Sequence, residues 1–164
     1  MHEHIELLRK IPQHVQKSTE WLEQRKGYLT SSDAATALGI NPYEKPVDLL
    51  FKKCGAGKPF TGNIATRWGE KYEDEAISMY SAAVGSSNNE FGLIPLTEVY
   101  KLTGEVPRYT GSHILAGSPD GVAVSATGEL VLLEVKCPFR RKIVAGYCPA
   151  YYYPQVQLNM YICG

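Results

Sequence analysis

The chain has 164 residues, of which 44% are hydrophobic and 21% are charged, and its 17 basic residues balance its 17 acidic residues. This length suits one domain with a buried core, and the balanced charge excludes the global positive field of many nucleic-acid-binding proteins, so any such binding must be local. No apolar run approaches the ~20 residues that span a bilayer, so we expect no membrane association.

The N-terminus mixes charges with short apolar pairs and lacks the pattern of a signal peptide. We therefore expect an intracellular protein, in the cytoplasm or nucleus of a host cell, that is not secreted. The cysteines are scattered without a C-x-x-C pair, at Cys54, Cys137, Cys148 and Cys163. This spacing argues against a disulfide scaffold and against a zinc or iron–sulfur site, and it favours buried thiols.

The first half of the chain, about residues 1–84, is predicted to be helical. Residues 1–26 form two helical pieces broken at Pro12, and TSSDAATALG and KPVDLLFKKCG each begin with helix-starting residues and end at a glycine. The longest helix is predicted in NIATRWGEKYEDEAISMYSAAVG, where apolar side chains recur every four residues at Ile64, Trp68, Tyr72, Ala76 and Tyr80.

Two acidic residues of that helix differ in where they point. Glu73 lies beside the apolar stripe, whereas Asp74 is turned about 100° further toward solvent. We therefore expect Glu73 to face the interior.

Strands are predicted after Gly85. The segment GLIPLTEVY indicates an edge or bulged strand because of Pro95, and SHILAGSPDGVAVSATGELVLLEVKCP alternates around a turn. In that turn, ATG suits a three-residue hairpin loop with Gly128 in the left-handed conformation.

This loop fixes the register of the hairpin. Val124 then pairs with Leu130, and Asp120 lies opposite Glu134. Opposed side chains approach to about 5 Å between β-carbons, where two carboxylates repel each other. Either one carboxylate is protonated, or a cation lies between them.

A basic residue joins these acids in LLEVKCP. The period of two along a strand places Glu134 and Lys136 on one face and Val135 on the other, and Pro138 is expected to end the strand. Two carboxylates suit a hard divalent cation, and a nearby ammonium group can orient a water or stabilise a phosphate, so the set suits phosphodiester hydrolysis. A lone E-x-K is also a common surface pattern, and the opposed acid is what favours catalysis.

At these motifs the sequence resembles the PD-(D/E)XK nuclease superfamily, and within it the phage lambda exonuclease and YqaJ-type viral recombinase family. SPDG followed by LLEVKCP resembles the metal-binding core, and WGEKYEDEA resembles the upstream acidic helix. YYYPQVQLNMY resembles the downstream Gln-bearing helix, and WLEQRKGYLTSSDA resembles the segment that receives a 5′ phosphate. The resemblance implies an α/β fold with a restriction-endonuclease-like core, in which helices flank a small mixed sheet with a catalytic hairpin.

One nuclease domain is expected over residues 1–164. Its parts are the N-terminal helical region of about 1–84, the hairpin and sheet of about 91–137 and the Gln-bearing helix of about 150–163. Related nucleases usually continue into another strand and helix, so the chain is either a fragment or a compact member of the family.

The resemblance also implies roles for individual residues. It makes Lys136 the catalytic lysine, and it implies a Mg²⁺ site, with Mn²⁺ able to substitute, whose ligands are the Asp120, Glu134 and Glu73 side chains and the Val135 carbonyl. Gln155 would lie near the lysine and the attacking water. A glutamine in an aromatic helix could equally satisfy a buried backbone group.

The expected DNA contacts lie on both sides of this site. Arg25 and Ser32 would grip the 5′ phosphate, although Arg25 could be a solvated charge and Ser32 only a helix cap. Arg140 and Arg141, in the FRRK run, would contact the DNA backbone. Tyr152 matches the site tyrosine of the family. Pro154 leaves its orientation open, because the helix either begins there or is kinked.

These features predict a Mg²⁺-dependent deoxyribonuclease, and the resemblance favours a 5′-to-3′ exonuclease on double-stranded ends, preferably 5′-phosphorylated. Such an enzyme leaves 3′ single strands for viral or phage-type recombination or DNA processing. Family members often form homo-oligomers, commonly trimeric rings, and work beside a single-strand annealing protein. The alternatives are an endonuclease or RecB-like repair nuclease, and a catalytically silent subunit for DNA-end binding or assembly.

Overall fold

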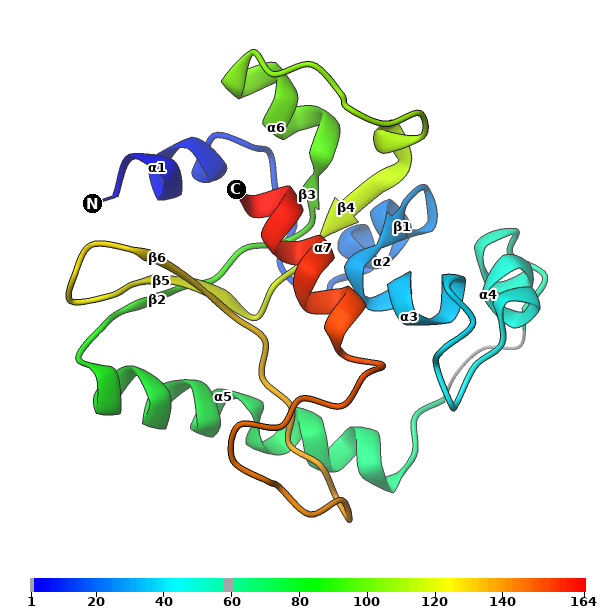
Figure 1. Ribbon diagram of the computed structural model, residues 1–164. Coiled ribbons are helices and arrows are strands. Elements are labelled where there is room, and N and C mark those ends of the chain that lie inside the picture. Colours follow the sequence, from blue (N-terminus) through cyan, green and yellow to red (C-terminus); the bar gives the residue numbers. More distant parts are fainter. Residues whose placement is uncertain (1, 58–60) are drawn as a thin grey trace.

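The computed structural model describes residues 2–57 and 61–164, which form a mixed α/β fold with small sheets (Figure 1). The helices are α1 (Glu3–Arg9), α2 (Thr19–Lys26), η1 (Ser31–Asp33), α3 (Ala34–Ala37), α4 (Pro46–Lys53), α5 (Ile64–Val84), α6 (Leu96–Thr103), η2 (Ser112–Ile114) and α7 (Tyr153–Cys163). The strands are β1 (Leu29–Thr30), β2 (Asn88–Asn89), β3 (Ile94–Pro95), β4 (Leu115–Gly117), β5 (Gly121–Val124) and β6 (Leu130–Leu133). In these described ranges no helix is long and apolar enough to cross a membrane.

The helices expected in the first half of the chain are present, and local sequence explains their ends. The Ser18 hydroxyl accepts a hydrogen bond from the Trp21 amide at 3.2 Å, which caps α2. Pro46 occupies the first turn of α4, and Gly85, with φ of 65°, ends α5. The short strand β1 lies among these helices and was not expected.

The strands form two three-stranded sheets, which corrects the expectation of one small mixed sheet. In the first sheet β4 pairs in parallel with β1 and antiparallel with β3, and in the second β5 pairs antiparallel with β2 and β6. Between β4 and β5 the chain passes through Ser118, Pro119 and Asp120. Because Pro119 has no N–H to donate, the ladder is interrupted there, and β5 continues in a different sheet.

The hairpin has the predicted register. Gly121 pairs with Leu133 and Val124 with Leu130, and Gly128 is left-handed with φ of 86°. β6 ends at Leu133, however, and not at Pro138. Beyond Leu133 the Val135 amide donates to Oδ2 of Asp120 at 2.6 Å, so a side chain takes the place of the backbone ladder.

Residues 96–103 form a helix, α6, and the prediction of a strand throughout GLIPLTEVY was wrong. Leu96, Val99 and Tyr100 are buried, and this is the three- and four-residue spacing of one helix face. Pro95 contributes to the short strand β3 and precedes the helix as its N-cap residue. In a strand Leu96 and Val99 would point to opposite faces, so burial of all three against one core favours the helix.

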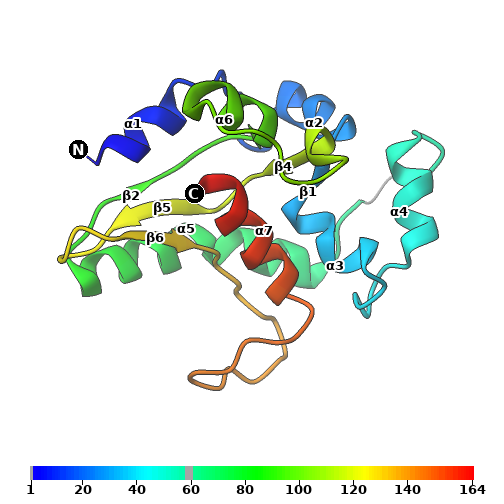
Figure 2. The same cartoon turned by 45° about the horizontal axis from the view of Figure 1, so that its top comes forward.

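The longest helix, α5, contacts the rest of the molecule along a different face from the one predicted. Ile64, Trp68 and Tyr80 are exposed, and no residue of the helix is fully buried. The half-buried positions follow a neighbouring stripe that includes Thr66, Gly69, Tyr72, Glu73, Ala76 and Ile77. Figures 1 and 2 show α5 lying alone along one side of the hairpin sheet. This rotation turns Glu73 inward, as expected from its place in the sequence.

The core lies where α1, α6 and α7 meet the two sheets. It includes Ile5 and Leu8 of α1, Ile94 of β3, Val122 of β5 and Ile162 of α7. All four cysteines are free, as predicted, and Cys163 is buried. Cys54 and Cys148 are exposed, which corrects the expectation of buried thiols. Cys54 is the C-cap residue of α4, and Cys148 lies in the loop between β6 and α7.

Candidate active site

The SPDG turn and the end of β6 bring Asp120, Glu134 and Lys136 together. The backbone bond from Val135 to Asp120 holds Asp120 against the strand end at 2.6 Å. The Glu134 side chain is only 5% exposed, and the Lys136 ammonium forms an ion pair with its Oε1. The acid and the lysine thus meet as their alternation along the strand predicted.

Helix α7 supplies the other contacts to Glu134. Gln155 donates from Nε2 to Oε1 at 2.5 Å, and Asn159 donates from Nδ2 to Oε2 at 3.0 Å. These two amides lie one helical turn apart, which places them on the same face of α7. Asn159 is fully buried and was missed by the sequence reasoning. Its position four residues after Gln155 is a signal that could have identified it.

The start of α7 settles the orientation left open by Pro154. The helix begins at Tyr153 with Pro154 in its first turn, so Pro154 does not kink it. The Tyr152 ring lies beside two cations, with its centroid 5.7 Å from both Lys136 Nζ and Arg141 Cζ. Tyr152 therefore faces the site and not the solvent side of the loop.

Burial and crowding of charge control the protonation of this site. Burial raises the pKa of Glu134 to about 7, the ion pair with Lys136 opposes the shift, and the charge of Asp120 adds to it. Burial alone would lower the pKa of Lys136, but the carboxylate of Glu134 holds it above its ordinary value. The repulsion expected between the two opposed acids is thus present in the structure.

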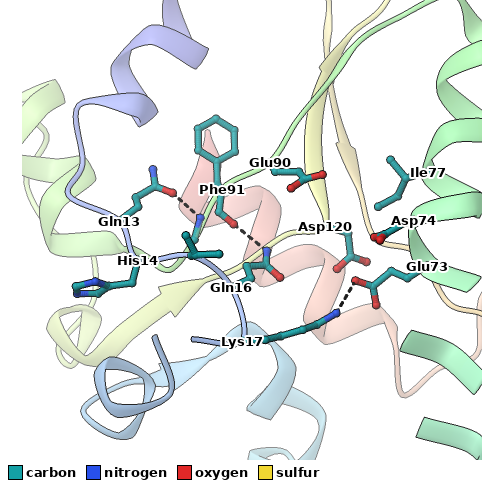
Figure 3. A pocket seen from close by; sticks show the side chains of 12 residues that line it. Gln13, His14, Gln16, Lys17, Glu73, Asp74, Ile77, Glu90, Phe91 and Asp120 are labelled. Carbon is teal, nitrogen blue, oxygen red and sulfur yellow. Dashed lines mark hydrogen bonds and ion pairs between the residues drawn. The ribbon is translucent and has the colours of Figure 1, made fainter. Parts of the chain in front are cut away.

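Glu73 reaches the same region from α5, across a cavity of about 420 Å³ that Asp120 also lines (Figure 3). The opposite wall is the segment 13–17. Gln16 anchors it by donating to the carbonyls of Phe91 at 2.8 Å and Pro119 at 3.2 Å. Lys17 has φ of 67°, which is rare for a residue with a side chain, and its Nζ lies 3.4 Å from Glu73 Oε1. Sequence reasoning missed Gln16 and Lys17. The sequence around them reveals neither a left-handed φ angle nor a partner far away in the chain.

The donor chemistry of these acids fits a hard divalent cation. Asp120 and Glu134 are neighbouring carboxylates that repel each other, and such a pair is stabilised by a cation. Glu73 faces the cavity that Asp120 lines. Over residues 2–57 and 61–164, however, no three Asp, Glu, His or Cys side chains are already close enough to hold an ion together.

The predicted phosphate-binding pair is also assembled. Arg25 donates from Nη2 to the Ser32 hydroxyl at 2.7 Å and to that of Thr30 at 3.2 Å. Its guanidinium lies 4.3 Å from the centroid of the Trp21 ring, and burial lowers the pKa of Arg25, with the charge of Asp33 opposing that shift. Thr30, and not Ser32, is the N-cap residue of η1. Arg25 is therefore not a freely solvated charge, and Ser32 does not serve as the cap.

The basic run, residues 139–142, follows the segment that carries Glu134 and Lys136, and it contacts α5. The ring of Phe139 packs against that of Trp68 with centroids 5.5 Å apart, and the Arg140 guanidinium lies 5.5 Å from the Phe139 ring. Arg140 is exposed and Arg141 is half-buried beside Tyr152. Arg141 thus lies near the site beside Tyr152, and the aromatic contact places the neighbouring Phe139 and Arg140 against α5.

In comparison with known proteins, residues 20–164 match the YqaJ-like viral recombinase domain. The chain belongs to this family. The YqaJ-like domain is 34% identical over 171 residues to an uncharacterized protein of Acanthamoeba polyphaga mimivirus, covering 96% of the chain and 29% of the relative. It is 28% identical over 176 residues to a protein of African swine fever virus, covering 95% of the chain and 48% of the relative. The chain thus spans less than half the length of these viral relatives.

The fold of the YqaJ-like domain is similar to that of a solved bacterial enzyme. The crystal structure of the alkaline exonuclease LHK-Exo from Laribacter hongkongensis matches with a TM-score of 0.60 at 24% identity, covering 87% of this chain and 67% of that one. The complex of LHK-Exo with dAMP matches with a TM-score of 0.62 at 25% identity and the same coverage. The resemblance to PD-(D/E)XK, lambda-exonuclease-like proteins that the sequence motifs indicated is therefore confirmed.

Proposed function

We propose that this YqaJ-like domain is a Mg²⁺-dependent deoxyribonuclease with a restriction-endonuclease-like core, and that it degrades linear duplex DNA from the 5′ end. The observation that carries the proposal is the meeting of Asp120, Glu134 and Lys136 at the end of the hairpin. The likeness to an alkaline exonuclease that was crystallised with dAMP supports it.

In this proposal Asp120, Glu134, Glu73 and the Val135 carbonyl would hold Mg²⁺, or Mn²⁺ in its place. When bound there, such an ion would lower the pKa of a coordinated water and would offset phosphate charge. The Lys136 ammonium, on the same side as Glu134, can donate to the attacked phosphate or orient the attacking water.

The amide groups of α7 prepare this arrangement. Gln155 and Asn159 each donate to one oxygen of Glu134, so they fix the plane of its carboxylate before substrate binds. Gln155 is the more accessible of the two, since Asn159 is fully buried. It can therefore also orient the attacking water.

The polarity of cutting rests on Arg25 and Ser32. The Arg25–Ser32 pair would grip a 5′ phosphate, because a guanidinium and a hydroxyl bonded to each other can both donate to its oxygens. Tyr152 would stack on a base, and Arg140 and Arg141 would contact the backbone. The products would be 3′ single strands for viral or phage-type recombination or DNA processing. The family resemblance adds two further expectations: the domain would assemble with copies of itself into a trimeric ring, and it would work beside a single-strand annealing protein.

The proposal is tested by digestion of end-labelled linear duplex DNA in Mg²⁺ and in EDTA. We expect cutting in Mg²⁺ alone, release of label from the 5′ end, and a loss of about 100-fold or more in Lys136→Ala. Lys71→Ala is a matched control, because Lys71 is an exposed lysine of α5 whose ammonium lies 5.1 Å from the Tyr72 ring centroid and is not among the site residues. It should cut at the wild-type rate.

Three outcomes would contradict the proposal. Digestion of a closed circular duplex without nicks would favour the endonuclease alternative. Equal rates for wild type and Lys136→Ala would exclude the proposed site. Tight binding of DNA ends without any cutting in Mg²⁺ or Mn²⁺ would favour a catalytically silent subunit.

A further inference from the structure

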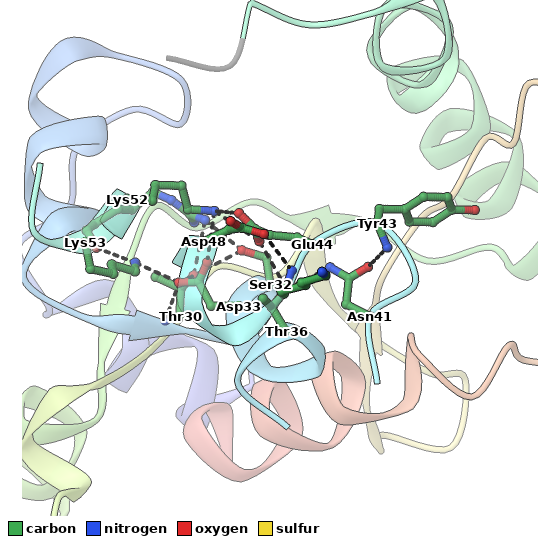
Figure 4. Close-up of polar contacts among 12 residues, drawn as sticks. Thr30, Ser32, Asp33, Thr36, Asn41, Tyr43, Glu44, Asp48, Lys52 and Lys53 are labelled. Carbon is green, nitrogen blue, oxygen red and sulfur yellow. Dashed lines mark hydrogen bonds and ion pairs between the residues drawn. The ribbon is translucent and has the colours of Figure 1, made fainter. Parts of the chain in front are cut away.

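A buried carboxylate, Asp33, lies near Thr30 and Ser32 (Figure 4), and Thr30 links it to Arg25. It is 4% exposed, and its Oδ2 accepts hydrogen bonds from the Thr30 amide at 3.0 Å and the Thr30 hydroxyl at 2.7 Å. The same hydroxyl accepts from Arg25. One hydroxyl group thus separates a buried negative charge from the guanidinium that would grip the DNA end.

Helix α4 supplies the counterion. Lys53 Nζ lies 2.7 Å from Asp33 Oδ2 and donates to the Arg25 carbonyl at 3.0 Å, and its side chain is 22% exposed. The neighbouring Lys52 is 3.8 Å from Asp33 Oδ1, but it lies 3.0 Å from Glu44 and is 48% exposed. Lys53 is therefore the sheltered partner of Asp33, and Lys52 is shared with another acid.

The position of this ion pair has an electrostatic consequence. A carboxylate so close to a phosphate site repels the phosphate, and the repulsion is strong where burial limits screening by water. Hydrogen bonds from Lys53 and Thr30 outweigh the effect of burial and keep the pKa of Asp33 below its ordinary value, so its negative charge is present at neutral pH. Only a nearby cation can cancel that charge.

We propose that Lys53 is a specificity-determining residue. By cancelling the charge of Asp33, it gives the Arg25–Ser32 pair its preference for a phosphorylated DNA end. The role rests on the proposed recognition of a 5′ phosphate by Arg25 and Ser32. Lys53 acts through that pair and does not itself touch the reacting atoms.

Substitutions at the two positions separate this role from a structural one. Asp33 accepts the hydrogen bonds that shape the turn, so a structural role predicts that Asp33→Asn is at least as harmful as Lys53→Met, and that both slow cutting at every kind of end. If Lys53 acts by cancelling charge, Lys53→Met should be more harmful than Asp33→Asn. Lys53→Met leaves Asp33 with only the more distant and exposed Lys52, which is shared with Glu44, whereas Asp33→Asn removes the offending charge and keeps an oxygen for Thr30.

The experiment compares initial rates on linear duplexes that carry a 5′ phosphate or a 5′ hydroxyl. We expect Lys53→Met to lower the phosphate-to-hydroxyl rate ratio by about tenfold, with little change on hydroxyl ends. Asp33→Asn and the double variant Asp33→Asn/Lys53→Met should keep the ratio within about twofold of wild type, and so should Lys53→Arg. Lys26→Met is the matched control, because Lys26 of α2 is exposed and pairs only with Glu23 among the described residues.

The melting temperature and the rate on hydroxyl ends report whether each variant is folded. If Lys53→Met is unfolded, Lys53→Gln replaces it, and recovery of the ratio in the double variant remains decisive. An unchanged ratio in Lys53→Met, or an equal fall on both kinds of end, overturns the inference while leaving the proposed function intact. A wild-type protein that cuts both ends equally would overturn 5′-phosphate recognition as well.

Discussion

Glu134 is where three distant parts of the chain meet. Asp120 approaches it across the hairpin, Lys136 follows it by two residues, and Gln155 and Asn159 reach it from α7. The sequence left two ways to relieve the repulsion between Asp120 and Glu134, a proton or a cation. Burial, and to a smaller extent the charge of Asp120, raises the pKa of Glu134 to about 7, so a proton can relieve the repulsion below that pH, and a divalent cation would do so in its place.

This raised pKa predicts how stability depends on pH. A glutamate has a pKa of 4.5 in the unfolded chain, whereas the pKa of Glu134 in the folded protein is about 7. The folded protein binds this proton more tightly, so the free energy of unfolding falls as the pH rises from about 4.5 to about 7, and it stays lower above that range. The expected loss is on the order of 3 kcal/mol.

Urea unfolding in EDTA across this range measures the loss, and Glu134→Gln isolates it from other titrating groups. As the pH rises, the wild type should lose stability relative to this variant. Mg²⁺ should reduce the loss in wild type alone. A difference that stays constant from pH 4.5 to pH 7 would show that Glu134 keeps an ordinary pKa.

At the level of elements, sequence reasoning succeeded where the pattern and the turn are local. The register of β5 and β6 follows from one three-residue loop, whereas α7, whose N-cap residue makes no side-chain cap, was expected from the family resemblance. It failed where packing decides. Leu96, Val99 and Tyr100 become a helix because the core accepts that face. Ile64 and Trp68 of α5, which were expected to be buried, are exposed instead.

The same reason explains which site residues were predicted. Asp120, Glu134 and Lys136 are linked by strand alternation and a short loop, so their meeting could be predicted from the sequence. Lys17 meets Glu73 across 56 positions, and Lys53 meets Arg25 across 28. Such pairs depend on how whole helices are placed, which no local pattern specifies.

The packing of α7 on β4 gives a prediction at this scale. A β-carbon added at Gly117 would lie 2.8 Å from Asn159 Oδ1 and 3.3 Å from Ile162 Cγ2. Gly117→Ala must therefore push α7 away from β4, which we expect to cost about 1–3 kcal/mol of stability. Because Asn159 moves with the helix, its bond to Glu134 should weaken and the cutting rate should fall. Thermal melting and the nuclease assay measure the two effects.

Gly69→Ala is the matched control for this change. Gly69 lies within α5, and no atom lies within 4 Å of an added β-carbon. Alanine is favoured over glycine inside a helix by about 1 kcal/mol, so this variant should be as stable as wild type or more so. A Gly117→Ala protein that melts at the wild-type temperature would mean that α7 does not pack this closely on β4.

For the molecule as a whole, the equal numbers of basic and acidic residues leave no net charge to attract DNA. Binding must then depend on local cations, and the basic run lies where Phe139 packs against Trp68 and Arg141 lies beside Tyr152. Figure 1 shows the loop between β6 and α7 on the side of α5, away from α6. The molecule is therefore expected to bind DNA from one side.

This one-sided binding is tested by the salt dependence of affinity for a linear duplex, measured in EDTA so that the DNA stays intact. Each phosphate contact adds about 0.9 to the slope of log affinity against log salt, so Arg140→Ala/Arg141→Ala should reduce the slope by about 2 and weaken binding equally for all sequences. Lys101→Ala/Arg108→Ala removes the same charge in and after α6, and it should leave the slope unchanged. If both double variants lose affinity equally, net charge and not the basic run controls binding, and the position of Phe139 against α5 has no bearing on it.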